Sequence, residues 1–218
     1  MPTRILLVRH GESEWNAAGR WQGRADPPLS DLGRRQAVTA ARAVGAVDGV
    51  FSSPLLRAFA TATLIAEAVG VGPIVVDDDL VERDAGEWSG LTRCEIEEQW
   101  PGYLDPPPAD EHTEFGAAGS ERSMPRRRPP GWEGDDAVLE RGLAAIDRIH
   151  ARVDGGEVLA VTHGGLIYML ERHLGAPFGR LANLEGRWVT RDGDGLRLGD
   201  RACLIDPAVV PVTIPGQL

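Results

Sequence analysis

Two histidines follow apolar runs that are typical of buried strands. His10 comes after Ile5–Val8 with Arg9 between them, and His163 comes shortly after Val158–Val161. A continuous apolar run of this length indicates a strand that is covered on both faces, as in a parallel sheet. Because ligands bind beyond the carboxyl ends of such strands, we expect the two histidines to meet at a ligand-binding edge.

The residues expected at this edge fit phosphoryl transfer. A neutral imidazole such as that of His10 is a nucleophile towards phosphorus. The transition state carries charge on three equatorial oxygens, so catalysis is mostly positioning plus fixed positive charge. The guanidinium groups of Arg9 and Arg57 match phosphate oxygens in pairs, and His163 can add a hydrogen bond. Arg57 is expected near a helix N-terminus, where a cation is disfavoured unless it serves an anion.

A proton donor for the leaving group is expected just after the third strand. Glu82 lies there, and its carboxyl can act as general acid and then as general base towards water. Asp84 and Glu87 are close by in the chain and stay open as alternatives. Backbone N–H groups near Gly23 and Gly164 can complete a cradle for the phosphate.

A metal centre is the main alternative use of these side chains. His10, Glu82, His112 and His163 are potential ligands. Arg9 stands next to one of them and would repel a cation, and no two of them have the spacing of metal ligands on one helix. Because the arginines already supply positive charge, the sequence predicts neither a metal nor a cofactor.

Strands and helices are expected to alternate along most of the chain, which predicts an α/β fold with a mostly parallel sheet covered on both faces. The expected strands are Ile5–Val8, Val50–Ser52, Pro73–Val76 and Val158–Val161, then a hairpin of Arg187–Arg191 and Leu196–Leu204. The expected helices are Asp31–Val44 after the N-cap Ser30, Ser53 (as N-cap) to about Val69, a short helix after Thr92, one from near Asp135, and Leu166–Leu174. The apolar stripe of the helix near Asp135 is expected to comprise Leu139, Leu143, Ile146, His150 and Val153.

The segment 101–134 has neither a helical nor a strand pattern. It is rich in proline and glycine and carries the basic run Arg126–Arg128. A long unpatterned segment inside a compact domain is commonly a functional lid. Because candidate catalytic residues lie on both sides of it, we expect one domain over residues 1–218 with a lid insertion at about 101–134.

The composition narrows the class of protein. A chain of 218 residues suits one sizeable domain, and its net charge of −10 opposes binding to nucleic acid or to anionic membranes. The first apolar run is too short for a signal peptide, and no stretch reaches the length of a membrane span, so we expect a cytoplasmic protein. The two cysteines, Cys94 and Cys203, are expected to be reduced thiols.

Four sets of short motifs occur in a fixed order along the chain. They are Arg9–Asn16 followed by Arg20–Gly23, then Ser52–Ala58, then Leu80–Glu82 with Gly86–Gly90, and finally Thr162–Gly165. Together they resemble the motifs of the histidine phosphatase superfamily, in its phosphoglycerate mutase-like branch. Each motif alone is weak, but the ordered set spans most of the chain and is specific.

The resemblance implies a fold and a role for each site residue. The fold would be a three-layer α/β/α sandwich around a mostly parallel sheet. His10 would carry a phosphohistidine intermediate, and Glu82 would be the proton donor. The residues implied to bind the phosphoryl group or line its pocket are Arg9, Asn16, Gln22, Gly23, Arg57, His163 and Gly164.

Three functions are weighed on this basis. The segment Gly86–Gly90 is similar to the phosphatase form of the acid motif, and the lysine of the mutase form is absent, so the main expectation is a metal-independent phosphoric monoester hydrolase of the histidine acid phosphatase type. Its substrate would be a small phosphorylated metabolite. The alternatives are a phosphoryl transfer of the cofactor-dependent phosphoglycerate mutase type and a non-catalytic phosphate-binding module.

Some features of the sequence leave more than one prediction for the substrate and for the oligomeric state. The run Arg126–Arg128 partly resembles an arginine segment of the mutases, or serves a second anionic group on the substrate. The family often carries other residues at the positions of Ala60, Tyr168 and Trp132. The short apolar tail after Pro207 can dock on its own domain or on a second copy, so a homodimer stays an open expectation.

Overall fold

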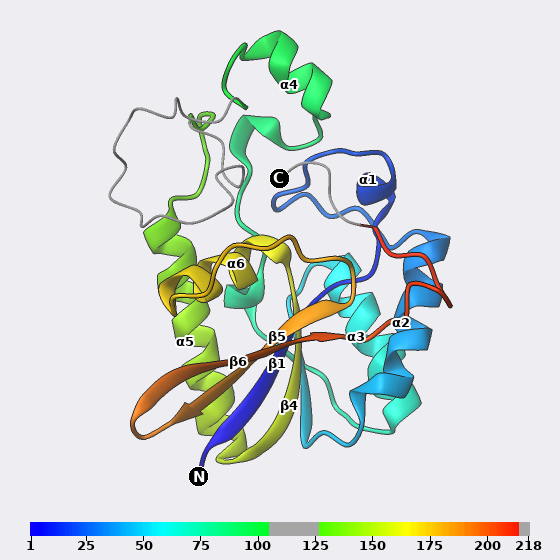
Figure 1. The fold of residues 1–218 in the computed structure, drawn as a ribbon, viewed down its shortest axis with the longest axis vertical. Coiled ribbons are helices and arrows are strands. Elements are labelled where there is room, and N and C mark those ends of the chain that lie inside the picture. The colour runs from blue at the N-terminus through cyan, green and yellow to red at the C-terminus, as the bar shows by residue number, and fades with distance from the viewer. Residues whose placement is uncertain (105–126, 214–218) are drawn as a thin grey trace.

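A central six-stranded sheet organises the computed structural model, which describes residues 1–104 and 127–213 (Figure 1). The strands are β1 (Thr3–Arg9), β2 (Gly49–Ser52), β3 (Val75–Val76), β4 (Gly156–Thr162), β5 (Glu185–Asp192) and β6 (Gly195–Cys203). The helices are α1 (Glu14–Ala17), α2 (Asp31–Val44), α3 (Leu56–Val69), α4 (Arg93–Gln99), α5 (Asp135–Val153) and α6 (Gly164–His173). Two single 3₁₀ turns, Asp78–Leu80 and Gly86–Trp88, lie between β3 and α4.

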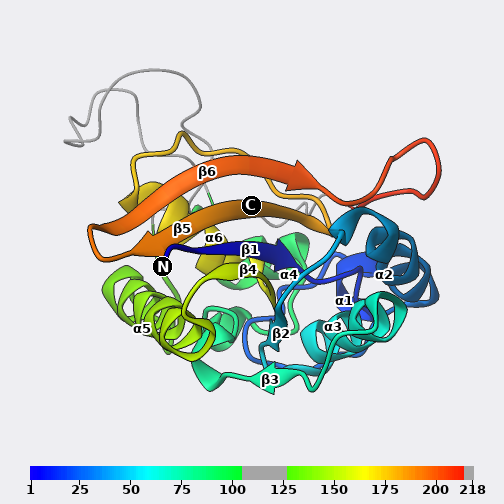
Figure 2. The same ribbon diagram turned by 90° about the horizontal axis from the view of Figure 1, so that it is seen from below.

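The sheet has the order β3-β2-β4-β1-β5-β6. Strands β3, β2, β4 and β1 pair in parallel, whereas β5 and β6 add to β1 as an antiparallel hairpin. Helices cover both faces, with α5 and α6 on one side and α2 and α3 on the other (Figure 2). The predicted α/β/α sandwich with a mostly parallel sheet is confirmed.

Alternation along the strands divides the core between the two faces. In β1, Ile5 and Leu7 pack into the cluster beneath α5 and α6, whereas Leu6 and Val8 pack into the cluster beneath α2 and α3. Successive side chains of a strand point to opposite faces, so an unbroken apolar run is what a sheet covered on both sides requires.

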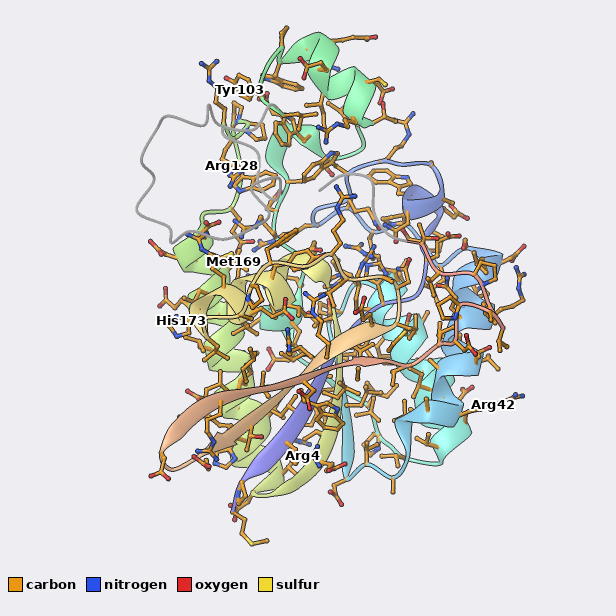
Figure 3. The ribbon with its side chains drawn as sticks, viewed as in Figure 1. Arg4, Arg42, Tyr103, Arg128, Met169 and His173 are labelled. Carbon is orange, nitrogen blue, oxygen red and sulfur yellow. The ribbon has the colours of Figure 1, made fainter. Side chains whose placement is uncertain are left out.

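A smaller aromatic cluster lies away from the sheet, towards α4. Its fully or nearly fully buried members are Trp21, Ala85, Trp88 and Ile96, and Tyr103 and Trp132 pack against them. Figure 3 shows Tyr103 and Arg128 in this upper part of the molecule, beyond the ends of the sheet strands. This cluster therefore covers the same end of the sheet at which β1 and β4 finish.

Several predicted elements are confirmed with their local causes. Helix α2 has the predicted bounds, and the Ser30 hydroxyl accepts a hydrogen bond from the N–H of Gly33 as its N-cap. Helix α4 begins with the predicted capping box between Thr92 and Glu95. The hairpin of β5 and β6 turns at the predicted Asp192–Gly195.

Helix α3 corrects one prediction. Ser53 is not its N-cap: the helix begins at Leu56, and its N-cap Leu55 has no side-chain capping bond. The backbone N–H of Ser53 instead donates to Val161 O at 3.0 Å, which extends the β2–β4 pairing by one residue. The Ser53 side chain is thereby placed beside β4 rather than over the end of the helix.

Two other elements also differ from the predictions. Strand β3 is limited to Val75–Val76 instead of the predicted four residues. In α5 the fully buried residues are Val138, Gly142, Ala145, Ile146 and Ile149. The buried stripe is thus centred about one residue earlier than predicted. Its Gly142 faces α6, where a Cβ would be in ordinary contact with Leu166, 3.6 Å from Cγ. The predicted Leu139, Leu143 and Val153 are partly buried.

Candidate active site

Three neighbouring parallel strands end at one edge of the sheet and place the predicted residues there. In the sheet β2 lies next to β4, and β4 next to β1. The N–H of His10 donates to Thr162 O at 3.1 Å, so the segments that follow β1 and β4 stay paired beyond the last sheet residues. His10 and His163, distant in sequence, have ring centroids 5.1 Å apart. The convergence expected from the strand ends is therefore present.

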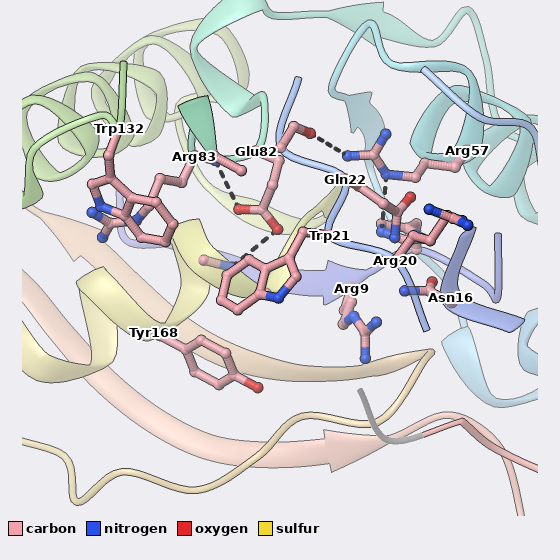
Figure 4. Close-up of a pocket in the computed structure, with 15 residues that line it drawn as sticks. Arg9, Asn16, Arg20, Trp21, Gln22, Arg57, Glu82, Arg83, Trp132 and Tyr168 are labelled. Carbon is pink, nitrogen blue, oxygen red and sulfur yellow. Dashed lines mark hydrogen bonds between the residues drawn. The ribbon is translucent and has the colours of Figure 1, made fainter. Parts of the chain in front are cut away.

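A pocket that is open to solvent lies at this edge (Figure 4). It extends from the two strand ends to the aromatic cluster. Its lining residues are Arg9, His10, Asn16, Arg20, Trp21, Gln22, Gly23, Arg57, Glu82, Arg83, Ala85, Trp132, Gly164, Gly165 and Tyr168. All the predicted site residues line this pocket except His163, which is fully buried beside His10.

The hydrogen bonds of His10 determine which ring nitrogen is reactive. Its Nδ1 lies 2.6 Å from Gly11 O, and since a carbonyl oxygen only accepts, Nδ1 carries the proton. Nε2 then keeps its lone pair and accepts a hydrogen bond from Nε of Arg57 at 3.2 Å. Burial, followed by the charges of Arg57 and Arg9, holds the pKa of His10 well below its ordinary value of 6.5. The ring is neutral, with Nε2 available as a nucleophile.

Two buried guanidinium groups supply the positive charge. Arg57 donates to Gly23 O at 2.9 Å and to Ala25 O at 2.7 Å, and Arg9 donates to Leu181 O at 2.8 Å. Neither forms an ion pair within residues 1–104 and 127–213. Burial lowers the pKa of Arg57 to about 10, and it also lowers the pKa of Arg9. Two such groups held by neutral carbonyl oxygens form a site that favours an anion.

His163 presents a second neutral imidazole. Its Nε2 lies 2.8 Å from Ser53 Oγ, and its Nδ1 is buried with no hydrogen-bond partner among the described residues. Burial lowers the pKa of His163 well below 6.5, and the charge of Arg57 lowers it further. An unpartnered buried nitrogen on a ring beside His10 is a candidate contact for an oxygen of the same anion.

Glu82 is the only one of the three predicted carboxyl candidates that lines the pocket. Its Oε1 accepts from the N–H of Arg83 at 2.8 Å, and its Oε2 accepts from the N–H of Gly165 at 3.3 Å. A Cβ on Gly165 would lie 2.3 Å from Oε1, so a side chain there would displace the carboxyl group. Asp84 and Glu87 do not line the pocket.

The backbone before Glu82 is fixed by a partly buried arginine. Arg141 of α5 donates to Asp79 O and Val81 O at 2.7 and 2.6 Å. It also donates to both carboxylate oxygens of Glu133, and Oε2 of Glu133 accepts from the N–H of Asp84 as well. The segment that carries Glu82 is thus held on both sides by one connected network.

The remaining predicted residues Asn16, Gln22, Gly23 and Gly164 also line the pocket. Asn16 accepts from the N–H of Ser13, and Gln22 accepts from its hydroxyl, which ties the two amide side chains to one turn. Gly23 has φ +52°, and a Cβ there would lie 2.6 Å from Ala85 N. Only glycine lets this loop pass so close to the Ala85 backbone.

Some residues of the site were not predicted. Ser53 contacts His163, and Asn183 donates from Nδ2 to His10 O at 2.8 Å. Arg83 lies with its guanidinium 5.5 Å from the centre of the Trp132 ring. The position of Ser53 four residues before Arg57 and directly after a strand was a usable signal. Asn183 and Trp132 come from loops, for which the sequence carried no comparable signal.

The described residues also bear on the predictions about metal ligands, cysteines and membrane spans. Within residues 1–104 and 127–213, no group of three or more His, Cys, Asp or Glu side chains is arranged to hold a metal ion. His112 lies outside the described residues, as does most of the predicted lid. Cys94 and Cys203 are free thiols. No helix of the described part is both long and apolar enough to cross a bilayer.

The chain matches the profile of a known protein family over most of its length. A profile of the histidine phosphatase superfamily (branch 1) matches residues 5–190, well over half of the chain. The chain belongs to the histidine phosphatase superfamily. All four motif regions recognised in the sequence lie within the matched residues, and the pocket described above is where these motifs meet.

Related members of the superfamily include phosphatases. A metal-independent phosphoserine phosphatase of Arabidopsis thaliana is 34% identical over 207 residues, which are 94% of this chain and 80% of the relative. A solved structure of a mycobacterial glucosyl-3-phosphoglycerate phosphatase in complex with VO3 has a TM-score of 0.72 at 29% identity, covering 90% of this chain and 96% of that one.

A third relative differs in length. A bifunctional protein of Mycobacterium tuberculosis is 40% identical over 174 residues, which are 78% of this chain but only 44% of the relative. The chain thus spans less than half the length of that curated relative.

Proposed function

We propose that this protein is a metal-independent phosphatase that hydrolyses small phosphomonoesters through a phosphohistidine on His10. The observation that carries the proposal is the state of His10: its Nδ1–H donates to Gly11 O, which leaves the Nε2 lone pair beside Arg57. Relatives with phosphatase activity in their names support hydrolysis as the reaction.

In the first step, Nε2 of His10 attacks phosphorus and the bond from phosphorus to the ester oxygen breaks. Glu82 donates a proton to the departing oxygen, so an alcohol leaves and Glu82 becomes a carboxylate. Arg9 and Arg57 stabilise the charge on the equatorial oxygens. The histidine takes on the phosphoryl group with a positive charge on its ring, which Gly11 O favours by accepting from Nδ1–H.

In the second step, the Glu82 carboxylate takes a proton from water, and the water oxygen attacks phosphorus. The bond from phosphorus to Nε2 breaks, which releases inorganic phosphate and returns neutral His10 and protonated Glu82. Each step leaves charge and protons balanced, and neither uses a metal. The aromatic part of the pocket, with Trp21 and Trp132 in its lining, gives the leaving group an apolar wall.

The test is phosphate release from p-nitrophenyl phosphate and from a panel of sugar phosphates, phosphoglycerates and phosphoamino acids, with EDTA present throughout. Wild-type protein is expected to release phosphate, and His10→Asn is expected to lose on the order of 10⁴-fold or more in kcat. His173→Asn, which removes an exposed histidine at the end of α6, is the matched control and is expected to keep wild-type activity.

Two outcomes would contradict the proposal. Rapid isomerisation of 3-phosphoglycerate in the presence of 2,3-bisphosphoglycerate, with little free phosphate, would identify a mutase. Tight binding of inorganic phosphate without turnover of any ester would identify a phosphate-binding module.

A further inference from the structure

Ser53 is a fully buried residue whose hydroxyl has no role in capping α3. It follows β2 directly, and its backbone is held on both sides: its N–H donates to Val161 O, and its carbonyl accepts from Ser52 Oγ at 2.8 Å. Its Oγ lies 2.8 Å from His163 Nε2 and accepts from the N–H of Leu55 at 3.3 Å. The side chain therefore has a fixed position between the start of the α3 segment and the second histidine.

The direction of the bond between Ser53 and His163 follows from the partners available to the hydroxyl. A serine hydroxyl has one proton to donate and two lone pairs that accept. The N–H of Leu55 occupies one lone pair, and His163 Nε2 is the only other partner of Oγ among the described residues. If Nε2 carried a proton, the buried hydroxyl proton would be left without an acceptor, which is costly.

We infer that Ser53 is a positioning residue that donates its hydroxyl proton to Nε2 of His163 and so holds this histidine as the Nδ1–H tautomer. The buried Nδ1–H has no partner among the described residues, and its ring lies beside His10 with the two ring centroids 5.1 Å apart, so Nδ1–H is the donor left for an anion bound at His10. The consequence for phosphoryl transfer rests on the proposed function, whereas the tautomer itself does not.

The tautomer matters because His163 must donate to a phosphoryl oxygen, which can only accept. Burial, followed by the charge of Arg57, lowers the pKa of His163, so before an anion binds the ring carries a single proton. With a single proton, the ring donates to an anion from Nδ1 only if Nε2 is kept as an acceptor. Ser53 is the group that keeps it so.

The two histidines of the site thus use one tautomer in opposite ways. In His10 the protein backbone accepts from Nδ1–H, and the Nε2 lone pair is left for chemistry. In His163 a hydroxyl occupies the Nε2 lone pair, and Nδ1–H is left for binding. One ring is prepared to attack phosphorus, and the other to bind an oxygen attached to it.

Nitrogen-15 NMR of histidine-labelled protein tests the tautomer in the wild type without any turnover. Assigned by comparison with His163→Gln, the His163 ring is expected to show a protonated Nδ1 and an unprotonated Nε2 near neutral pH. A protonated Nε2 in the wild type would overturn the inference, whatever the variants do. A protein that fails to hydrolyse any ester but shows the Nδ1–H tautomer would refute the proposed function and leave the inference standing.

Variants of Ser53 test whether the His163 tautomer affects phosphoryl transfer. In Ser53→Ala the ring is free to carry its proton on either nitrogen, and kcat is expected to fall by roughly 10- to 100-fold, less than the full loss of one anion-binding donor. The inhibition constant for inorganic phosphate should rise. Ser53→Thr keeps the hydroxyl and is expected to recover most of the activity and the wild-type tautomer.

Ser52→Ala is the matched control, because Ser52 is equally buried but its hydroxyl donates to Ser53 O and does not contact His163. It is expected to keep the Nδ1–H tautomer and nearly wild-type kcat. Equal losses in Ser52→Ala and Ser53→Ala, or an unchanged tautomer and kcat in a folded Ser53→Ala, would overturn the inference. Thermal unfolding of each variant shows whether it is folded.

Discussion

The two ends of the pocket are built by different forces. At the phosphoryl end, Arg9, His10 and Arg57 are each held by hydrogen bonds to main-chain carbonyl oxygens. At the aromatic end, the rings of Trp21, Trp88 and Trp132 pack edge to face, with centroids 5.3 to 5.8 Å apart. None of the three indole N–H groups has a hydrogen-bond partner among the described residues.

This difference predicts different tolerance to change. Hydrogen bonds to fixed backbone atoms set the position of a side chain within narrow limits, as phosphoryl transfer requires. Ring packing fills space and can be rebuilt with other apolar side chains at modest cost. We therefore expect changes at the phosphoryl end to lower kcat by at least about 10²-fold, and changes at the aromatic end to alter substrate preference.

Among the changes that compare the two ends, the largest effect is expected for Glu82→Gln, which keeps the shape of the side chain but removes its acidic proton. For an alkyl phosphate, kcat should fall by about 10² to 10⁴-fold, because the poor leaving group needs protonation. For p-nitrophenyl phosphate, whose leaving group is stable as an anion, the loss of the first step should be much smaller. Burst and steady-state rates on both esters measure this, and an equal loss on both would contradict the role of Glu82 as acid.

Arg57→Lys is expected to come next. Lysine keeps the charge but cannot donate together to His10, Gly23 O and Ala25 O as the guanidinium does. The loss in kcat should be about 10² to 10³-fold, measured by steady-state phosphate release. Arg148→Lys, in which the arginine is half exposed and pairs with Asp77 and Asp79, is the control and should be silent. A fully active Arg57→Lys would show that the paired geometry is not needed.

Trp132→Ala tests the aromatic end. It removes one wall of the pocket and the ring beneath the Arg83 guanidinium, but it touches no group of the phosphoryl end. We expect KM to rise by up to about 10-fold for bulky apolar esters, with kcat nearly unchanged, in line with the loss of ground-state binding. Trp132→Phe should restore most of the affinity. A fall in kcat as large as that of Arg57→Lys would remove the distinction between the two ends.

The smallest effect concerns acid stability. The pKa of His163 is lower in the folded protein than its ordinary value of 6.5, so below about pH 6.5 the unfolded chain takes up a proton that the folded protein does not. Stability from this residue is therefore present above that pH and is lost as the pH falls. Between pH 7 and 5.5 the loss is about 1 kcal/mol for one such histidine.

Denaturant unfolding at the two pH values measures this difference. Wild-type protein should lose about 1 kcal/mol more than His163→Gln over this range. Trp132→Ala changes no titratable group and should keep the wild-type difference. Identical pH dependence in wild type and His163→Gln would mean that the histidine is not buried as a neutral ring.

The sequence predicted most of the phosphoryl end of the pocket but little of the aromatic end. Strand ends at His10 and His163 were readable because unbroken apolar runs precede them, and sheet geometry alone brings such ends together. The predicted start of α3 is wrong because serine before proline is a common cap, whereas here the N–H of Ser53 continues the pairing of β2 with β4.

The aromatic end shows the limit more clearly. Trp21, Trp88 and Trp132 come from separate loops, and their contact depends on long-range packing that no local pattern encodes. The connection from Arg141 through Glu133 to the segment of Glu82 is equally non-local. The buried face of α5 likewise differs from the face predicted by the spacing of its apolar residues. It includes Gly142, which packs against Leu166 of α6.

The most direct test of the account is to trap the enzyme during turnover. Protein quenched within the first turnover in alkali, which preserves phosphohistidine, is digested with trypsin and analysed by mass spectrometry. The peptide expected from cleavage at Arg9 and Arg20 contains His10 as its single histidine. The account predicts a phosphoryl group on His10 in this peptide, absent from His10→Asn. Turnover of substrate with no phosphorylated His10, or with the phosphoryl group on another residue, would contradict it.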